Sequence, residues 1–247
     1  MKITYSKIKN VKHKKKKKKS YYFNQNNFDI KKTKSCRANC WIVVPELKVI
    51  YMLNAKVMST SIKSVLGQLQ GFKISNKNPH KLPLHYVHIG KILSEKKKYR
   101  NYFKFTFVRN PWARLWSCYC QKSRQKIPLH YHFLQFDFRK HITWDAFVNR
   151  ACEISDNVAD MHIRSQSYAI DVISADFIGK QESTDDDWRT LQTHIKDLPD
   201  LPHLQPNNFK HDIGSKGHVY KYANKQIEMV AKRYKNDICL FDYDFLN

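Results

Sequence analysis

The chain has 247 residues, a formal net charge of +24 at pH 7 and 13% aromatic residues. This length is sufficient for one α/β domain with a substantial core, and a content of six Gly and eight Pro excludes a low-complexity chain. No stretch approaches the roughly eighteen apolar residues of a membrane-spanning helix. We therefore expect a soluble, cytoplasmic protein without a membrane span.

Half of the charge lies at the N-terminus. Residues 1–34 contain thirteen Lys and one Asp, hence +12, and the other 213 residues carry the remaining +12. The run Lys14–Lys19 predicts that residues 1–38 form a basic, Lys-rich disordered tail. Because no apolar segment follows the run, it is not a signal peptide. Such a tail is either a solvated arm or a segment that attracts nucleic acid or another acidic surface, and residues 39–247 form the folded domain.

The six cysteines lack the spacing of metal ligands. Three residues separate Cys36 from Cys40, one residue separates Cys118 from Cys120, and no second pair follows at zinc-ligand spacing. Cys118 and Cys120 fall on different sides of one predicted helix, so they cannot easily form a disulfide. We expect reduced cysteines, partly in the core, and no bound metal.

Predicted strands and helices alternate from residue 41 onward. The chain enters the domain at Trp41–Val44, and the apolar run Val49–Leu53 is typical of a buried parallel strand. A loop over 54–59 and a helix over 60–69 follow, the helix with apolar residues recurring on one face. Further predicted elements are a short helix within 85–93, a strand over 103–108, helices over 111–124 and 143–151, and an irregular segment over 125–141.

The second half of the chain continues this alternation. Val172–Ile178 is a predicted strand, and Thr184 is the predicted N-cap of the next helix with Asp187 at its third position. The three acidic residues after Thr184 complement the helix dipole and do not require a metal. A helix over 223–235 and the segment Ile238–Phe241 close the chain. The alternation predicts a three-layer, P-loop-like α/β fold with a central parallel sheet flanked by helices.

Arg109 and Ser117 are polar residues at a predicted strand–helix junction. Arg109 directly follows the strand pattern Phe103–Val108, and Pro111 suits the first turn of the next helix. An arginine fork together with a hydroxyl group at such a junction is suited to a phosphate. The sequence therefore predicts an anion site here.

A second junction of this kind lies upstream. Leu53 ends a predicted strand, and Lys56 and several hydroxyl residues follow at the start of a helix. Backbone N–H groups at a helix start can hold a phosphate. The sequence lacks the glycines of a Walker A motif, however, and the same residues also suit an ordinary capped helix. Because the ends of parallel strands meet at one sheet edge, the two junctions together predict a ligand with phosphates at two separated positions.

The stretch Phe105–Tyr119 has the pattern Phe-x-Phe-Val-Arg-Asn-Pro-Trp-x-Arg-Leu-x-Ser-x-Tyr, by which the chain resembles the carbohydrate sulfotransferases of the family 2 type. These enzymes transfer a sulfuryl group from 3′-phosphoadenosine 5′-phosphosulfate (PAPS) to a glycan hydroxyl. Similar landmarks follow one another at Ala55–Lys63, His162–Gln166, Phe177–Glu182 and Tyr234–Tyr243. The chain departs from the family pattern at Ala55, Ile62 and Gln181, none of which is a charged phosphate ligand.

The resemblance implies a PAPS site without a metal. Lys56 would contact the 5′-phosphosulfate and its bridging oxygen, and Arg109 and Ser117 would bind the 3′-phosphate. The other implied donor-binding residues are Val57, Met58, Ser59, Thr60, Ser61 and Lys63, the last of which equally suits a solvated helix face. Metazoan relatives are anchored in the Golgi by an N-terminal membrane helix, so this chain would belong to the Golgi lumen only as a truncated piece.

The acceptor hydroxyl needs a base. The resemblance points to His88 first and His85 second, because family members use a His in this interval. Glu182 is a further candidate, or it forms a structural ion pair. His162 and Gln166 either position the substrate or support the core.

Other interpretations stay open beside the enzyme. Trp112 and Trp116 stack on adenine or, as their helical spacing favours, pack in the core. The basic tail and the aromatic residues also suit a nucleic-acid-binding protein, whose affinity would depend steeply on salt. A P-loop nucleotide kinase is disfavoured by the missing glycines. The acceptor, a glycan or another hydroxyl compound, is expected to be selected by the loops 71–84 and 125–141, and the sequence does not indicate the oligomeric state.

Overall fold

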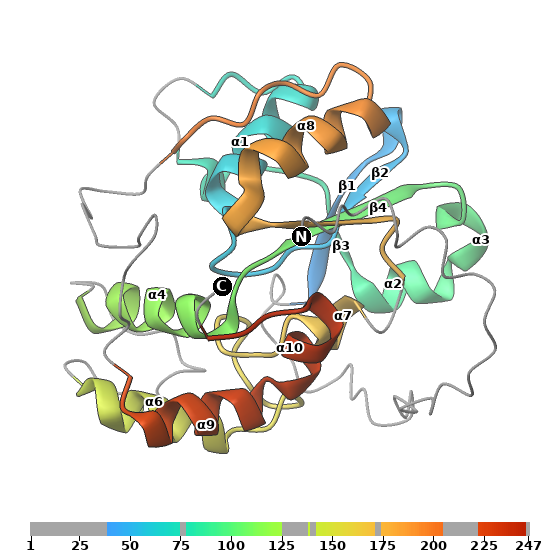
Figure 1. Cartoon of the computed structure of the whole chain (residues 1–247). Helices are drawn as coiled ribbons and strands as arrows, with labels where there is room; N and C mark the ends of the chain where they lie inside the picture. The colour runs from blue at the N-terminus through green and yellow to red at the C-terminus, as the bar shows by residue number, and fades with distance from the viewer. Residues whose placement is uncertain are drawn as a thin grey trace, which may run out of the picture.

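Figure 1 shows the computed structural model of the protein, a sheet with helices on both sides. The structure describes residues 39–74, 78–124, 138, 142–170, 174–204 and 222–245. The predicted tail over 1–38, most of the segment 125–141 and the beginning of the predicted strand Val172–Ile178 lie outside the described residues.

The sheet that the described residues form has five strands in the order β3-β1-β2-β4-β5. The strands are β1 (Cys40–Val44), β2 (Val49–Tyr51), β3 (Tyr86–His88), β4 (Phe103–Val108) and β5 (Phe177–Lys180). β2, β4 and β5 are parallel, but β1 is antiparallel to both β2 and β3. The prediction of a parallel sheet is therefore wrong for β1. A turn built on Pro45–Leu47 joins β1 to β2, which is too short for the crossover that parallel neighbours need.

The carboxyl ends of four strands meet at one edge of the sheet. Because β1 opposes both of its neighbours, β3 runs in the same direction as β2, β4 and β5. His88 ends β3, Arg109 follows β4, and Gln181 follows β5 at this edge. Neighbouring strands lie about 4.8 Å apart, so the end of β3 is roughly 10 Å from the end of β2.

Helices cover both faces of the sheet (Figure 1). They are α1 (Ser59–Leu69), α2 (Ile89–Ser94), α3 (Lys96–Tyr99), α4 (Pro111–Arg124), α6 (Trp144–Glu153), α7 (Ser167–Ile170), α8 (Thr184–His194), α9 (Asn224–Arg233) and α10 (Lys235–Phe241). α1 and α8 cover one face, in a buried cluster with Ile42 and Tyr51. α2, α3, α7 and α10 cover the other, in a cluster with Trp41 and Ile50. Successive strand residues point to opposite faces, which is why neighbours such as Trp41 and Ile42 belong to different clusters.

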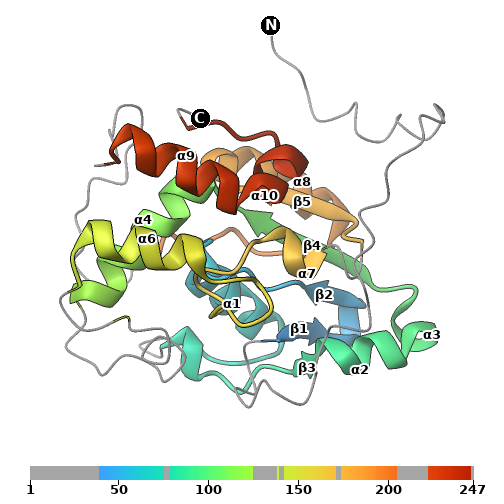
Figure 2. The same ribbon diagram turned by 90° about the horizontal axis from the view of Figure 1, so that it is seen from below.

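A third apolar cluster joins α4, α6 and α9 beyond the sheet. Figure 2 shows these helices packed together at one end of the molecule. Trp112 and Leu115 of α4, Phe147 of α6 and Val230 of α9 are all buried in this cluster. The cluster fixes α4 relative to the C-terminal helices. α4 carries most of the pattern Phe105–Tyr119, which is called the conspicuous motif below.

Several element boundaries differ from the sequence-based expectation. The segment 85–93 begins with β3 and becomes helical only at Ile89. Thr184 is the first residue of α8 and not its N-cap, because Ser183 precedes it in that position. The predicted C-terminal helix is interrupted at Tyr234, between α9 and α10. The helix over 111–124 is confirmed. Within the described ranges, none of the helices combines the length and the apolar character needed to cross a bilayer.

Candidate active site

The two predicted anion junctions are in contact at the carboxyl edge of the sheet. Arg109 follows β4, and its Nη1 donates to the backbone carbonyl oxygen of Lys56 at 3.4 Å, in the loop after β2. Arg109 is only 4% exposed. Two cationic residues that are 53 positions apart in the sequence are thus neighbours in the fold.

The loop after β2 is fixed by a buried amide and contains two left-handed residues. Asn54 Nδ2 donates to Thr106 Oγ1 at 3.2 Å and to the carbonyl oxygen of Phe107 at 3.1 Å, both in β4. Lys56 and Met58 have φ values of 66° and 46°. For residues other than glycine this conformation costs about 1–3 kcal/mol each, and such strain concentrates at functional sites. Here it lies directly before α1.

The first turn of α1 has hydroxyl groups but no side-chain cap. Its N-cap residue is Met58, which makes no side-chain hydrogen bond to the helix amides. Ser59, Thr60 and Ser61 form the turn, where the helix dipole and the free N–H groups favour an anion. The predicted phosphate loop therefore combines uncapped amides with three hydroxyl groups.

His80 packs against this turn from the segment before β3. Its Nε2 is 2.9 Å from Thr60 Oγ1, and its Nδ1 is 3.3 Å from Lys63 Nζ. Because the Lys63 ammonium can only donate, Nδ1 accepts, and the proton of a neutral ring is on Nε2. The Thr60 hydroxyl then accepts from His80 and keeps its own hydrogen for a ligand. Lys63 is buried, with its ammonium 5.8 Å from the centre of the Tyr86 ring, so it does not lie on a solvated helix face.

The side chain of Lys56 extends from the loop to α4. Its Nζ donates to Gln121 Oε1 at 3.0 Å. Burial, together with the positive charges of Arg109 and Lys122, lowers the pKa of Lys56 from 10.5 to about 8. Within the described part of the chain, no carboxylate forms an ion pair with Lys56. An anion bound here would offset the repulsion between these cations.

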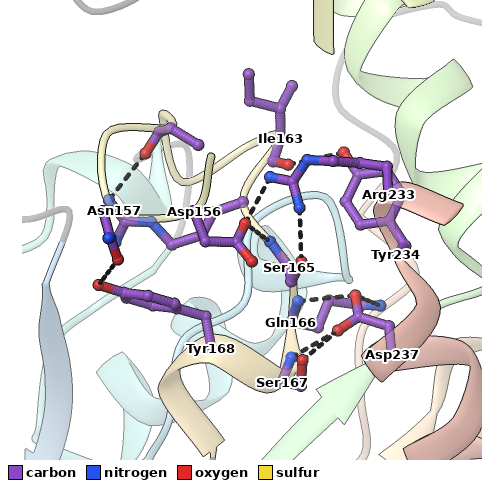
Figure 3. A network of polar contacts seen from close by, with 12 residues as sticks. Asp156, Asn157, Ile163, Ser165, Gln166, Ser167, Tyr168, Arg233, Tyr234 and Asp237 are labelled. Atoms are coloured by element: carbon purple, nitrogen blue, oxygen red, sulfur yellow. Dashed lines mark hydrogen bonds and ion pairs between the residues drawn. The ribbon is translucent and has the colours of Figure 1, made fainter. Parts of the chain in front are cut away.

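Gln166 holds the backbone of Arg109 in place. Its Oε1 accepts from the Arg109 N–H at 2.9 Å, and its Nε2 donates to the Arg109 carbonyl oxygen at 2.8 Å. The Gln166 N–H donates to Asp237 Oδ2 at 2.8 Å, and Ser167 donates to Asp237 Oδ1 through its N–H and its hydroxyl (Figure 3). Gln166 is fully buried. Of the two roles considered for it, the structure shows support of the fold.

The helix after Arg109 differs from α1 because its N-terminus is capped. Asn110 Oδ1 accepts from the backbone N–H of Trp112 at 3.0 Å and of Ala113 at 3.3 Å. These amides of α4 are therefore occupied. A phosphate beside Arg109 would be held by side chains, not by the start of the helix as the sequence suggested.

One face of α4 lines the Lys56 loop. Arg114 is 2% exposed and donates from Nε to the carbonyl oxygen of Ala55 at 3.0 Å. Gln121, two turns later, accepts from Lys56. Ser117 lies between them at helical spacing, so it belongs to the same face. Sequence reasoning missed Arg114 and Gln121, although Arg114 is part of the conspicuous motif.

The three predicted bases have different surroundings. His88 caps α2, because its Nδ1 accepts from the Gly90 N–H at 3.1 Å. His85 is exposed. Glu182 uses both carboxylate oxygens. One accepts from the backbone N–H of Asn110, directly before α4, at 2.8 Å, and the other accepts from the Tyr243 hydroxyl at 2.9 Å. The contacts of Glu182 are thus hydrogen bonds that hold α4 and the C-terminal segment.

His162 lies in the turns before α7 and close to the Lys56 loop. Its Nδ1 is 2.5 Å from Asp160 Oδ1, and its side chain is 26% exposed. Arg114 connects the two segments, since its Nη2 donates to the carbonyl oxygen of Met161 at 2.9 Å. The Arg114 guanidinium group therefore binds the backbone carbonyl groups of Ala55 and Met161, the residues directly before Lys56 and His162.

The tryptophans of the motif pack against other aromatic rings. Trp112 is 3% exposed, and its Nε1 donates to the carbonyl oxygen of Ile227 at 3.2 Å. The ring of Trp116 is 4.8 Å from that of Trp144. Core packing is thus confirmed for Trp112.

Over the described ranges, five cysteines are free thiols and no cluster of His, Cys, Asp or Glu is arranged to hold a metal ion.

The comparison with protein families covers almost the whole folded domain. A model of the Sulfotransferase family matches residues 39–244, from the start of β1 to the segment after α10. The chain has no significant match among curated proteins or among solved structures. The match includes the Lys56 loop, the Arg109 junction and α4. By this match the chain belongs to the Sulfotransferase family.

Proposed function

We propose that the protein transfers a sulfuryl group from PAPS to a hydroxyl group of a carbohydrate. The observation that carries this proposal is the contact between the two junctions, in which Arg109 Nη1 donates to the carbonyl oxygen of Lys56. Two cationic side chains and an uncapped helix start thus share one sheet edge, the usual place of ligands in such folds. The family match supports sulfuryl transfer in general.

The two junctions suit the two ends of the donor nucleotide. Lys56 and the amides and hydroxyls of 57–61 would hold the 5′-phosphosulfate, because uncapped helix amides favour an anion. The Arg109 fork and the Ser117 hydroxyl would hold the 3′-phosphate. Lys63 is a weaker candidate for the phosphates, since its ammonium contacts His80.

Lys56 would also contribute to the chemical step. Sulfuryl transfer resembles phosphoryl transfer, with in-line attack and negative charge growing on the leaving oxygen. A cation held beside that oxygen stabilises the transition state more than the ground state. The hydrogen bond to Gln121 and the burial of Lys56 restrict the ammonium to this region.

The carbohydrate acceptor rests on the likeness of Phe105–Tyr119 to the carbohydrate sulfotransferases. Its test is the transfer of radiolabelled sulfuryl from PAPS to neutral and uronic-acid polysaccharides, with a tyrosine peptide and 4-nitrophenol as other acceptors. We expect transfer to a polysaccharide, and Lys56→Ala should lower turnover on the order of 10²-fold or more. The exposed His203 provides a control, since His203→Gln should leave turnover unchanged. Absence of both transfer and nucleotide binding in the wild type would sink the proposal.

The charge of the chain favours a second candidate function, nucleic-acid binding. Half of the +24 net charge lies in residues 1–34, and a basic segment of this kind attracts polyanions. Such binding would weaken steeply with salt and would be lost when the segment is removed. It is compatible with sulfotransfer by the folded domain.

A further inference from the structure

We infer that Gln121 is the positioning residue of Lys56: its side-chain oxygen holds the ammonium at the proposed donor site and leaves the positive charge to the ligand. The inference rests on the proposed sulfotransfer, in which Lys56 meets the leaving group. Gln121 acts through Lys56 and not on the reacting atoms themselves.

Gln121 binds the end of the Lys56 side chain. Lys56 Nζ donates to Gln121 Oε1 at 3.0 Å, although the two residues are 65 positions apart in the sequence. Because an ammonium can only donate, the amide atom that faces it is the oxygen. A lysine has a flexible four-carbon stem, so an acceptor at its end selects one position for the charged group.

The backbone next to Lys56 is fixed from the same helix. Arg114 Nε donates at 3.0 Å to the carbonyl oxygen of Ala55, the residue directly before Lys56. Arg114 and Gln121 are about two turns apart on α4, so they lie on one face of it. α4 therefore holds Lys56 at both ends, through the preceding carbonyl group and through the ammonium.

α4 is a rigid support for these contacts. Its N-terminus is capped, since Asn110 Oδ1 accepts from the first free amides of the helix. Its residues Leu115 and Cys118 are buried in the cluster with α6 and α9 (Figure 2). Gln121 follows Cys118 by about one turn. A side chain is held precisely when the element that carries it is itself fixed by packing.

The partner of Lys56 is a neutral amide in cationic surroundings. Burial, together with Arg109 at its junction and Lys122 of α4, lowers the pKa of Lys56. The hydrogen bond from Lys56 to Gln121 favours the charged form. A carboxylate in this position would favour it further but would pair with the ammonium and repel an anionic ligand. The amide oxygen thus supports the charge without neutralising it.

Two thiols and an imidazole ring are the other titratable groups that face Lys56. They belong to Cys118 and Cys120 of α4 and to His162 of the turns before α7. Burial raises the pKa of Cys118 to about 11, so this thiol stays neutral at pH 7. An imidazole ring is neutral or positive and never an anion. Gln121 is therefore the side-chain acceptor that the fold gives to the Lys56 ammonium.

Two substitutions of similar size should shift the titration of Lys56 in opposite directions. Gln121→Met removes the acceptor, so the midpoint should move to lower pH by about one pH unit. Gln121→Glu adds a carboxylate, so the midpoint should move to higher pH by about one pH unit or more. The ¹³Cε resonance of Lys56 in the full chain, assigned by its loss in Lys56→Arg, measures the midpoint without nucleotide or acceptor. The same midpoint in Gln121→Met and the wild type would overturn the inference.

Gln68 provides the matched control for both substitutions. It is exposed near the end of α1, roughly 13 Å along the helix from Ser59, and charges in solvent are screened over such a distance. Gln68→Met and Gln68→Glu should leave the Lys56 midpoint within about 0.2 pH unit. A shift in Gln68→Glu as large as in Gln121→Glu would count against a specific contact.

Nucleotide binding distinguishes positioning from mere occupation of an empty site. In Gln121→Met, the Kd of adenosine 3′,5′-bisphosphate should stay within about threefold of the wild type at pH 6 and weaken about fivefold at pH 8, where less of Lys56 is charged. Gln121→Glu should weaken binding about tenfold or more at both pH values. Each comparison is made at one pH, so ionisation of the nucleotide itself cancels. Tighter binding by Gln121→Met would contradict the inference, because Gln121 would then compete with the ligand.

Turnover completes the test. We expect kcat of Gln121→Met to fall about 10- to 10²-fold, because the ammonium is displaced from the leaving oxygen, and kcat of Gln68→Met to equal that of the wild type. Full kcat in Gln121→Met, with the wild type active, would overturn the inference alone. A wild type that neither binds nucleotide nor transfers sulfuryl would overturn the proposed function, whereas the titration of Lys56 tests the Gln121 contact independently.

Discussion

Lys56 is a cation that the fold places beside two others. Arg109 and Lys122 both lower its pKa, in addition to burial, so that its pKa falls to about 8. A group that is protonated at neutral pH but close to losing its proton makes ligand binding sensitive to pH. The sequence predicted Lys56 as a phosphate ligand, but its environment depends on α4 residues whose approach no local pattern indicates.

The affinity for adenosine 3′,5′-bisphosphate should fall as pH rises through the pKa of Lys56. With a pKa of about 8, the charged fraction falls about tenfold between pH 7 and pH 9. Because only the ammonium attracts the anion, we expect a decrease in affinity of up to about tenfold over this range. Isothermal titration calorimetry at several pH values measures it.

Lys56→Arg is the matched variant for this titration. A guanidinium stays charged over the whole range, so the affinity of this variant should vary less than about twofold with pH. The account would be contradicted by equal pH profiles in the two proteins, because another group would then control the titration.

At the scale of elements, Asp237 of α10 connects the C-terminal helices to the site. It is fully buried and accepts the N–H groups of Gln166 and Ser167 and the Ser167 hydroxyl. Burial raises the pKa of Asp237, and these hydrogen bonds oppose the increase. Through Gln166, Asp237 supports the backbone of Arg109.

Asp237→Asn should destabilise the protein by about 2–4 kcal/mol. The amide nitrogen of Asn cannot accept, so buried donors lose their partner at about 1–3 kcal/mol each. Urea unfolding followed by fluorescence measures the change. Asp197→Asn is the control: Asp197 is exposed in a left-handed conformation (φ 59°) that Asn also tolerates, and we expect a change within about 0.5 kcal/mol. Equal stability of Asp237→Asn and the wild type would contradict the structural role.

The elements around the conspicuous motif could be predicted because their local signals agree. Phe103–Val108 alternates as a strand, and Pro111 starts a helix whose apolar residues recur at helical spacing. The direction of β1 depended on the short turn at Pro45–Leu47, which sequence reasoning did not use. The cap of α4 was also missed, because Asn110 was treated as part of the motif and not as an acceptor for helix amides.

At the scale of the whole molecule, the folded domain and the basic N-terminal segment are expected to act separately. Removal of residues 1–38 should leave the turnover of sulfotransfer within about twofold of the full chain, since the family match begins at residue 39. The same deletion should abolish any salt-dependent binding to nucleic acid. Transfer assays and fluorescence anisotropy with labelled oligonucleotides measure the two effects. Loss of transfer in a folded deletion protein would contradict this division.

The sequence predicted both halves of the proposed donor site but not how they meet. Lys56 and Arg109 each follow a strand, and that pattern is local. Their contact depends on β2 and β4 being neighbours, and on Arg114 joining the Ala55 carbonyl to a third segment. The contact between His162 and Asp160 lies in that third segment, and the sequence pattern did not indicate it.

The central claim is that the Lys56 loop and the Arg109 junction bind opposite ends of one nucleotide. Its most direct test is calorimetric titration of the wild type and Arg109→Gln with adenosine 3′,5′-bisphosphate and with adenosine 5′-monophosphate. We predict that the 3′-phosphate strengthens binding to the wild type by about 2–3 kcal/mol, roughly 30- to 150-fold. Arg109→Gln should lose this difference while binding the monophosphate as the wild type does. Equal affinity of the wild type for the two nucleotides would contradict the claim.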